Sequence, residues 1–233
     1  MLQDILNGRM DTAAWVGLLL RIPIILFSLS VHESAHAFVS HKLGDDTARN
    51  LGRITLNPAK HFDLFGFIFL MLFGFGWAKP VPVNTRNMKN GRWGFVAVSL
   101  AGPFSNILLA FLSAILSNLT AVILVYLPNY GGIPGILTMQ FFGIAVILNV
   151  GYAVFNLLPI PPLDGSRLWT ALLPRKIAMW TFRYEHYLQY LLIIFMYLGA
   201  FTNVLSTAIG VVTSGIYRIV NLIPFELLVR GAA

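Results

Sequence analysis

Long apolar runs dominate this sequence and decide the solvent in which it can fold. They cover residues 12–40, 63–77, 93–127, 136–158 and 187–225. Several exceed the ~20 residues that an α-helix needs to cross the hydrocarbon core of a bilayer. The chain is 57% hydrophobic and only 11% charged, which leaves too little polar surface to cover a globule in water. We therefore expect one all-α, polytopic domain in a lipid bilayer, with five or six membrane segments.

Basic residues gather in three short loops between the apolar runs, at 42–60, 79–92 and 167–183. The positive-inside rule places these loops on the cytoplasmic side of the cell membrane. Residues 117–140 carry no charge and belong on the other face. The net charge of +7 does not indicate a nucleic-acid partner, because the basic residues form no single stripe with interleaved aromatics.

The segment from 63 to 78 is too short for an ordinary crossing if the loops on both sides of it face the cytoplasm. Its glycines at 66, 74 and 76 fit a re-entrant element, which enters the membrane and returns. The last apolar run is too long for one crossing, and a break at 199–203 is expected there.

Two segments near the re-entrant element favour extended backbone. Trp77 to Asn84 contains two prolines that forbid helix, and the alternating pattern of Arg53 to Asn57 is typical of a short strand. Together they predict a small β-sheet at the cytoplasmic mouth. Two surface loops stiffened by proline are the alternative.

The sequence His32-Glu33-Ser34-Ala35-His36 is the strongest chemical signal. In a helix its two imidazoles lie about 6 Å apart on one face, a spacing that lets both bind one zinc ion. Glu33 stands beside them, free to act as a general base. Each ionisable group in a spanning helix raises the free energy of membrane insertion, so three such groups within five residues indicate function. The alternative is that this segment is simply the polar, interfacial end of the helix. Ser34 has no separate base and is discounted as a nucleophile.

A catalytic zinc site needs a third protein ligand. The chain has no cysteine, so the ligand must offer nitrogen or oxygen. Most carboxylates fall at the termini or in polar loops, whereas Asp164 follows the apolar, proline-rich sequence from Asn156 to Leu163. The prolines force an extended path, and Gly165 permits a turn that could aim Asp164 at the metal. Three further histidines lie beside loop charges, which favours solvated or structural roles for them: His41, His61 and His186.

Two asparagines in apolar surroundings are further candidates. Asn156 could donate a hydrogen bond to a substrate carbonyl or to the developing oxyanion. Equally, it could satisfy the free backbone carbonyls at the end of its helix. For Asn106 we expect a hydrogen bond between packed helices.

These motifs together resemble the site-2 protease family of intramembrane zinc metalloproteases. His32 to His36 match its zinc-binding motif, and Asn156, Pro159 and Leu163-Asp164-Gly165 match the second motif. The stretches 52–58 with His61, and 76–84, are similar to the small prokaryotic branch of the family. The likeness covers roughly residues 25 to 170.

The resemblance implies one Zn²⁺ per chain inside the bilayer towards its cytoplasmic side, with Asp164 as third ligand. It also implies transmembrane proteins as substrates, so that the expected reaction is intramembrane proteolysis. Family members often carry a PDZ domain or a CBS module, and we expect neither in the single domain 1–233. The spacing and the resemblance do not identify the oligomeric state, the substrate or its gate.

Two other functions are compatible with the same residues. A membrane zinc hydrolase could use this site on lipids or on soluble peptides. A metal transporter could use intramembrane histidine and aspartate as ion ligands, but transport gives no reason for Glu33 at its position.

Overall fold

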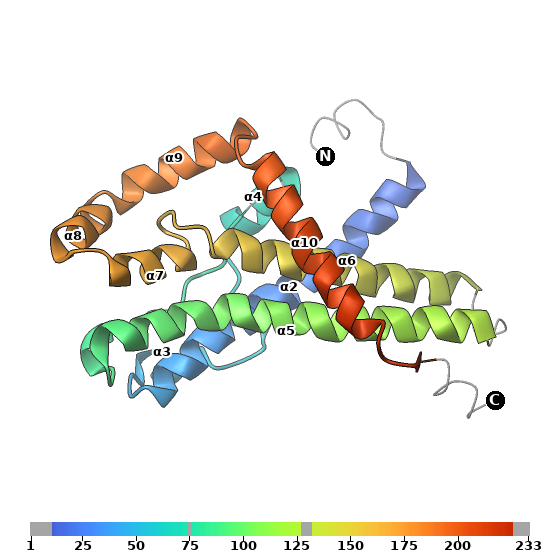
Figure 1. Cartoon of the computed structure of the whole chain (residues 1–233), viewed down its shortest axis with the longest axis horizontal. Coiled ribbons are helices and arrows are strands. Elements are labelled where there is room, and N and C mark those ends of the chain that lie inside the picture. The colour runs from blue at the N-terminus through green and yellow to red at the C-terminus, as the bar shows by residue number, and fades with distance from the viewer. Residues whose placement is uncertain (1–10, 74–75, 127–131, 226–233) are drawn as a thin grey trace.

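The computed structural model describes residues 11–73, 76–126 and 132–225, which form helices joined by turns and irregular loops (Figure 1). The expected all-α class is confirmed for these residues. The α-helices are, in chain order, α2 (Thr12–Lys42), α3 (Thr47–Asn50), α4 (Leu64–Phe73), α5 (Gly91–Tyr126), α6 (Gly132–Asn156), α7 (Asp164–Leu172), α8 (Arg175–Arg183), α9 (Glu185–Tyr197) and α10 (Thr202–Val220). Two short 3₁₀ turns lie between them, η1 (Pro58–Lys60) and η2 (Thr85–Asn87).

Four of the described helices are long and apolar enough to span a membrane: α2, α5, α6 and α10. α4 and α9 lie in the other apolar stretches, but at about 15 and 20 Å they are too short to cross the hydrocarbon core alone. The last apolar run breaks where the sequence predicts. Gly199, with a φ of 72°, follows α9 and lets the chain turn before α10 begins at Thr202.

The core lies where α5, α6 and α10 pack together (Figure 1). Ala110 and Ala114 of α5 are fully buried against Val146 and Val150 of α6, and Val220 of α10 belongs to the same cluster. Alanines four residues apart share one face of α5, and their small side chains let the helix backbones approach closely. This face continues towards the N-terminal half of α5, where α5 meets α2.

The chain doubles back after α4. A Cβ atom on Gly66 would overlap the carbonyl of Trp77, and one on Gly76 would overlap the carbonyl of Gly66. Glycine is therefore required at both positions by close approach of backbone. The backbone folds back on itself here, and whether this segment re-enters a bilayer stays a prediction. Gly74 lies outside the described residues.

Neither expected strand forms in the described residues. Residues 53–57 and 77–84 are irregular, because the prolines of the second segment lack the N–H groups that a ladder needs. The Arg53 guanidinium joins the two segments by donating to the Lys79 carbonyl. The Lys79 N–H donates to the carbonyl of the nearby His61 at 2.8 Å. The predicted sheet at the mouth is thus not observed, and the alternative of proline-stiffened loops describes this region.

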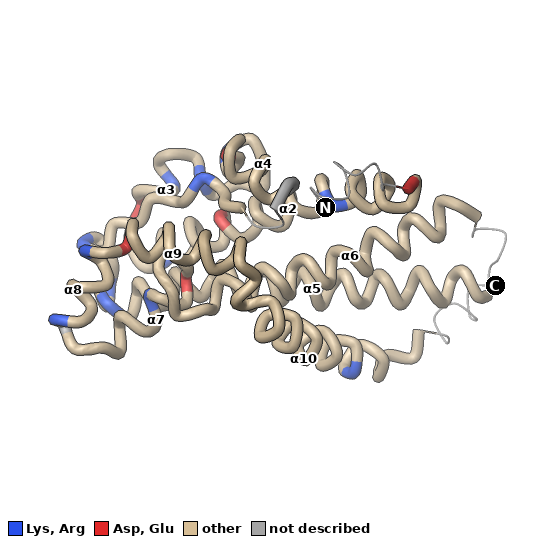
Figure 2. Tube along the Cα trace, turned by 90° about the horizontal axis from the view of Figure 1, so that it is seen from above, with Lys and Arg blue, Asp and Glu red and all other residues tan. Residues whose placement is uncertain are grey.

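Basic residues concentrate at one end of the molecule (Figure 2). Lys and Arg gather around α3, α7 and α8, whereas the end where α5 finishes and α6 begins is nearly free of charge. The three basic loops therefore lie at the same end, as their assignment to one side of the membrane requires. Which side of the cell membrane this end faces stays a prediction.

The alanine face of α5 generates a stability prediction. Ala114→Leu should lower the free energy of unfolding by about 1–3 kcal/mol, because the larger side chain overpacks the contact with α6. The control is Ala97→Leu, a substitution of the same size on an exposed position of α5, which should have little effect. Thermal unfolding in detergent measures both variants, and equal melting temperatures would contradict this account of the core.

Candidate metal centre

Two histidines from the last third of α2 form one side of the site. His32 and His36 are separated by one helical turn, so their rings project from the same face of the helix. Both are almost completely buried, at 5% and 8% exposure. The imidazoles were predicted to share a face, and the structure places their Nε2 atoms 3.1 Å apart.

Asp164 arrives from the far half of the chain, as the first residue of α7. The preceding residues form a tight turn that brings α7 back against the end of α6. Gly165 sits so close to the carbonyls of Leu157 and Leu158 that a Cβ atom would overlap them. The sequence indicated this glycine for a sharp turn, and the structure shows that lack of space is the reason, because the φ angle of Gly165 is not positive.

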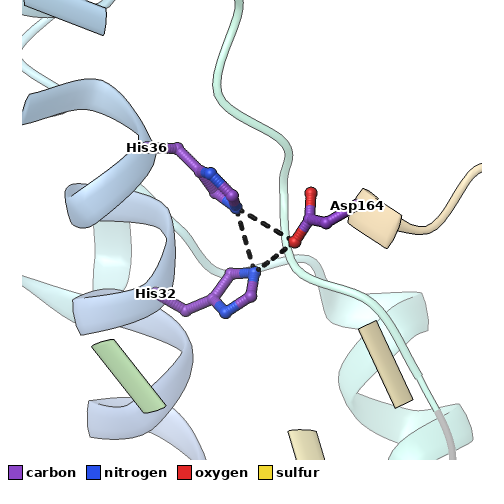
Figure 3. A group of neighbouring side chains, drawn as sticks. All are labelled: His32, His36 and Asp164. Atoms are coloured by element: carbon purple, nitrogen blue, oxygen red, sulfur yellow. Dashed lines mark hydrogen bonds and ion pairs between the residues drawn. The ribbon is translucent and has the colours of Figure 1, made fainter. Parts of the chain in front are cut away.

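The three side chains converge on one point (Figure 3). Oδ2 of Asp164 lies 3.2 Å from Nε2 of His32 and 3.3 Å from Nε2 of His36. Among the described residues, these three form a group whose ligand atoms are close enough to hold one metal ion. The sequence therefore named the three residues that the fold brings together.

Hydrogen bonds on the other side of each ring fix which nitrogen faces the centre. Nδ1 of His36 lies 2.7 Å from the Val98 carbonyl, which can only accept, so Nδ1 carries the proton. Nδ1 of His32 lies 2.5 Å from Oδ1 of Asn106, whose amide nitrogen donates to Oδ1 of Asn149 at 2.9 Å. In neutral rings both Nε2 atoms then present lone pairs to the centre.

The donor set fits zinc. Two imidazole nitrogens and a carboxylate oxygen meet at one point, and the buried Oδ2 of Asp164 has no hydrogen-bond donor. Such a cluster needs a cation. Ligand atoms in tetrahedral zinc sites lie about 3.3 Å apart, which matches the separations here. Two histidines and one carboxylate are also a ligand set of catalytic zinc, which keeps its fourth position open.

Gly102 of α5 makes room for this arrangement. A Cβ atom on Gly102 would overlap ring atoms of both His32 and His36. The α5 backbone is therefore one wall of the metal centre. Gly102 and Asn106 lie on the same face of α5, so a single helix supplies both the space and one of the outer hydrogen bonds.

A cavity of about 770 Å³ adjoins the centre, and Glu33 lines it together with His32, His36 and Asp164. Oε2 of Glu33 accepts a hydrogen bond of 3.0 Å from the N–H of Val81. The proline-rich segment 77–84 thus forms the wall next to Glu33. A carboxylate that is free of the ligand cluster but shares its cavity can act as a proton acceptor for a reacting water.

The two candidate asparagines have different surroundings. Asn156 lines the cavity, but its amide donates to the Tyr152 carbonyl at 3.0 Å, which is the helix-end arrangement that the sequence allowed as an alternative. Its role towards an oxyanion stays a prediction. Asn106 makes the expected bond between helices, to Asn149, and also binds His32, a contact that the sequence reasoning missed. The signal for Asn149 was available as a polar residue inside an apolar run.

The other three histidines lie outside the cluster, and two of them have recorded contacts. Nδ1 of His41 pairs with Asp46 at 2.5 Å. His61 is buried, and burial lowers its pKa, with the Arg53 cation acting in the same direction. His186 is exposed on α9.

Comparison with known proteins agrees with this geometry. A model described as Peptidase family M50 matches residues 21–131 and 116–199, which include the two histidines, Glu33 and Asp164. The chain belongs to peptidase family M50. As an M50 peptidase with four apolar helices of spanning length, it is a zinc metalloprotease of a membrane.

Several curated relatives of this M50 peptidase are named as zinc metalloproteases. YwhC of Bacillus subtilis (strain 168) is 46% identical over 159 residues, which are 64% of this chain and 67% of the relative. Rip2 of Mycobacterium tuberculosis (strain ATCC 25618 / H37Rv) is 34% identical over 148 residues, 60% of this chain and 52% of the relative. MJ0611 of Methanocaldococcus jannaschii is 30% identical over 153 residues, 62% of this chain and 71% of the relative. The match thus covers about half of Rip2 and about two thirds of YwhC. No solved structure matches the chain.

The hydrogen bond from His32 to Asn106 generates a prediction about metal affinity. Asn106→Ala should weaken zinc binding about 10–100-fold, because His32 loses the acceptor that fixes its ring and tautomer. The control is Asn118→Ala on the same helix, since Asn118 bonds Asn221 and not the centre. Competition with a zinc chelator measures both affinities, and an unchanged affinity in Asn106→Ala would show that the bond is dispensable.

Proposed function

We propose that this M50 peptidase hydrolyses peptide bonds in the transmembrane segments of substrate proteins, inside the lipid bilayer. In this proposal one zinc ion is held by His32, His36 and Asp164, and Glu33 is the general base. The observation that carries it is the convergence of the three ligand atoms beside a cavity that Glu33, outside the ligand group, also lines.

The chemistry divides between the metal and the chain. Bound zinc would lower the pKa of water and polarise the scissile carbonyl. Glu33 accepts the proton of the attacking water and delivers it to the leaving amine. The Val81 N–H orients the Glu33 carboxylate through a hydrogen bond to Oε2, which leaves Oε1 for the proton. Val98 and Asn106 hold the two imidazoles in the ligating tautomer.

The position of the site along α2 supports a location near the cytoplasmic face. His36 is six residues before Lys42, the last residue of α2, which corresponds to about 9 Å along the helix axis. Lys42 begins the first basic loop, at the end of the molecule where the other basic loops also lie (Figure 2). If this end faces the cytoplasm, the site lies inside the membrane, close to that side.

The substrate must be unwound before cleavage, because the hydrogen bonds of a helix shield its peptide bonds. Segment 77–84 offers backbone that can hold an unwound chain. Successive residues of extended backbone point their N–H groups to opposite sides, so the N–H of Val83 faces the same side as that of Val81, towards Glu33. No hydrogen bond recorded among the described residues uses the Val83 N–H, and Val83 lines the cavity. We assign this N–H to the substrate.

The reaction is tested with a transmembrane substrate and a soluble peptide of the same scissile sequence, both presented to the protein in liposomes. Glu33→Gln should lower cleavage of the transmembrane substrate at least about 100-fold while zinc content is kept. The neighbouring Ser34→Ala variant should cleave like the wild type. Preferential cleavage of the soluble peptide would favour the alternative hydrolase. Transport would be favoured if the protein cleaved neither substrate and if zinc uptake into the liposomes were the same in the wild type and in Glu33→Gln.

The role of the Val83 N–H is tested by replacing it. Val83→Pro should reduce cleavage by up to about tenfold with zinc content unchanged, the loss expected for one net hydrogen bond. Val83→Ala, which keeps the N–H, is the control and should stay near wild type. Val81→Pro is less informative, because it also removes the donor to Glu33. Full activity of Val83→Pro would refute substrate pairing at this residue.

A further inference from the structure

The wall beside Glu33 is a short backbone segment that is anchored at both ends. At one end the Lys79 N–H donates to the His61 carbonyl at 2.8 Å. At the other end the Asn84 N–H donates to Oδ2 of Asp45 at 2.7 Å. Between them the Val81 N–H donates to Glu33 at 3.0 Å. One contact with the general base thus lies between two fixed points.

Asp45 forms the anchor at the Asn84 end. It is fully buried at 0% exposure, in the turn directly after α2. Its carboxylate accepts hydrogen bonds from the Ser40 hydroxyl at 3.0 Å, from Thr47, from the Asn84 N–H and from the Asn87 amide at 3.2 Å. Burial alone would raise the pKa of Asp45, but the bonds from Thr47, Asn84 and Asn87 outweigh it and hold the pKa at about 2. The side chain is therefore ionised throughout the neutral range.

Asp45 connects this segment to the helix that carries the site. Ser40 lies one turn after His36 on α2, and Asn84 and Asn87 lie at the start and end of η2. The carboxylate therefore fixes residue 84 relative to the same helix from which Glu33 projects. Because an ionised acceptor forms stronger hydrogen bonds than a neutral one, this link is stiff.

Arg53 forms the anchor at the Lys79 end. Its guanidinium is buried, at 6% exposure, and donates to the Lys79 carbonyl. His61 completes the contact: its Nε2 donates to the Thr55 carbonyl at 2.9 Å, which leaves Nδ1 as an acceptor 3.5 Å from Arg53. Both backbone groups of Lys79 are thus bound, the N–H by His61 and the carbonyl by Arg53.

Two prolines make the segment between the anchors rigid. Pro80 and Pro82 have fixed φ angles, and they also restrict Lys79 and Val81 to extended conformations. Because proline has no N–H, Val81 is the single backbone donor among residues 80–82, and that donor binds Glu33. A displacement of either anchor is therefore transmitted to the hydrogen bond on the general base.

We propose that Asp45 and Arg53 are positioning residues for Glu33, which act by clamping the two ends of segment 79–84 so that the Val81 N–H holds the catalytic carboxylate in place. This inference rests on the proposed role of Glu33 as general base. Neither residue belongs to the group of metal ligands or lines the cavity. Their effect should therefore appear in turnover and not in zinc content.

The test compares Asp45→Asn with Asp46→Asn in the full-length protein. Asp46 is the neighbouring residue and pairs with His41, but it makes no hydrogen bond to segment 79–84. In Asp45→Asn, hydrogen–deuterium exchange of the peptide that covers 79–84 should become faster than in the wild type. With zinc content unchanged, kcat should fall about 10–100-fold and KM should change little, because misplacement of a catalytic group by about 1 Å has effects of this size. Asp46→Asn should match the wild type in every measurement.

Two results would overturn the inference: wild-type exchange of segment 79–84 in Asp45→Asn, or faster exchange with unchanged kcat. If Asp45→Asn does not fold, Arg53→Lys replaces it with the same readouts, and Arg49→Lys, at an exposed side chain of α3, is its control. The exchange measurement needs no proteolytic activity. A wild-type protein that cleaves nothing would therefore refute the proposed function, while exchange would still decide whether Asp45 clamps the segment.

Discussion

Three ligand atoms that meet at one largely buried point impose the strongest constraint on this fold. Two imidazole nitrogens and a carboxylate oxygen within 3.3 Å of one another repel unless a cation lies between them. The surrounding helices are arranged to hold this cluster. α2 supplies both rings, the first residue of α7 supplies the carboxylate, and α5 supplies the acceptors behind the rings. α6 in turn holds Asn106 through Asn149, so the bundle and the centre depend on each other.

The ligands could be predicted from the sequence because their spacing encodes local geometry. A helical turn places His32 and His36 on one face whatever surrounds it, and Asp164 was the one carboxylate within an apolar, proline-rich turn. The residues behind the ligands could not be found in this way. Whether Asn106 meets His32 depends on which face of α5 packs against α2, and no short-range pattern in the sequence records that choice. The Val98 contact is made by backbone and leaves no trace in residue identity.

The expected sheet was not found for a related reason. Alternating residues in 53–57 and prolines in 77–84 indicated extended backbone, but extended backbone does not guarantee a partner. Here the buried Arg53 guanidinium and the His61 carbonyl bind segment 77–84 at Lys79. Both contacts depend on long-range packing. The apolar runs predicted the helices well, including the short segment that contains α4 and the break that ends α9 before α10.

The absence of a side chain at Gly102 also constrains how the protein matures. The ring atoms of both histidines occupy the volume that a side chain at Gly102 would fill, so the α5 backbone completes the pocket from outside α2. A newly inserted α2 has two of the three ligands but neither the wall nor the acceptors that orient them. With zinc bound as proposed, stable metal capture would have to wait until α5 has docked and the chain has been synthesised as far as α7. Metal loading would then be a late step of biogenesis.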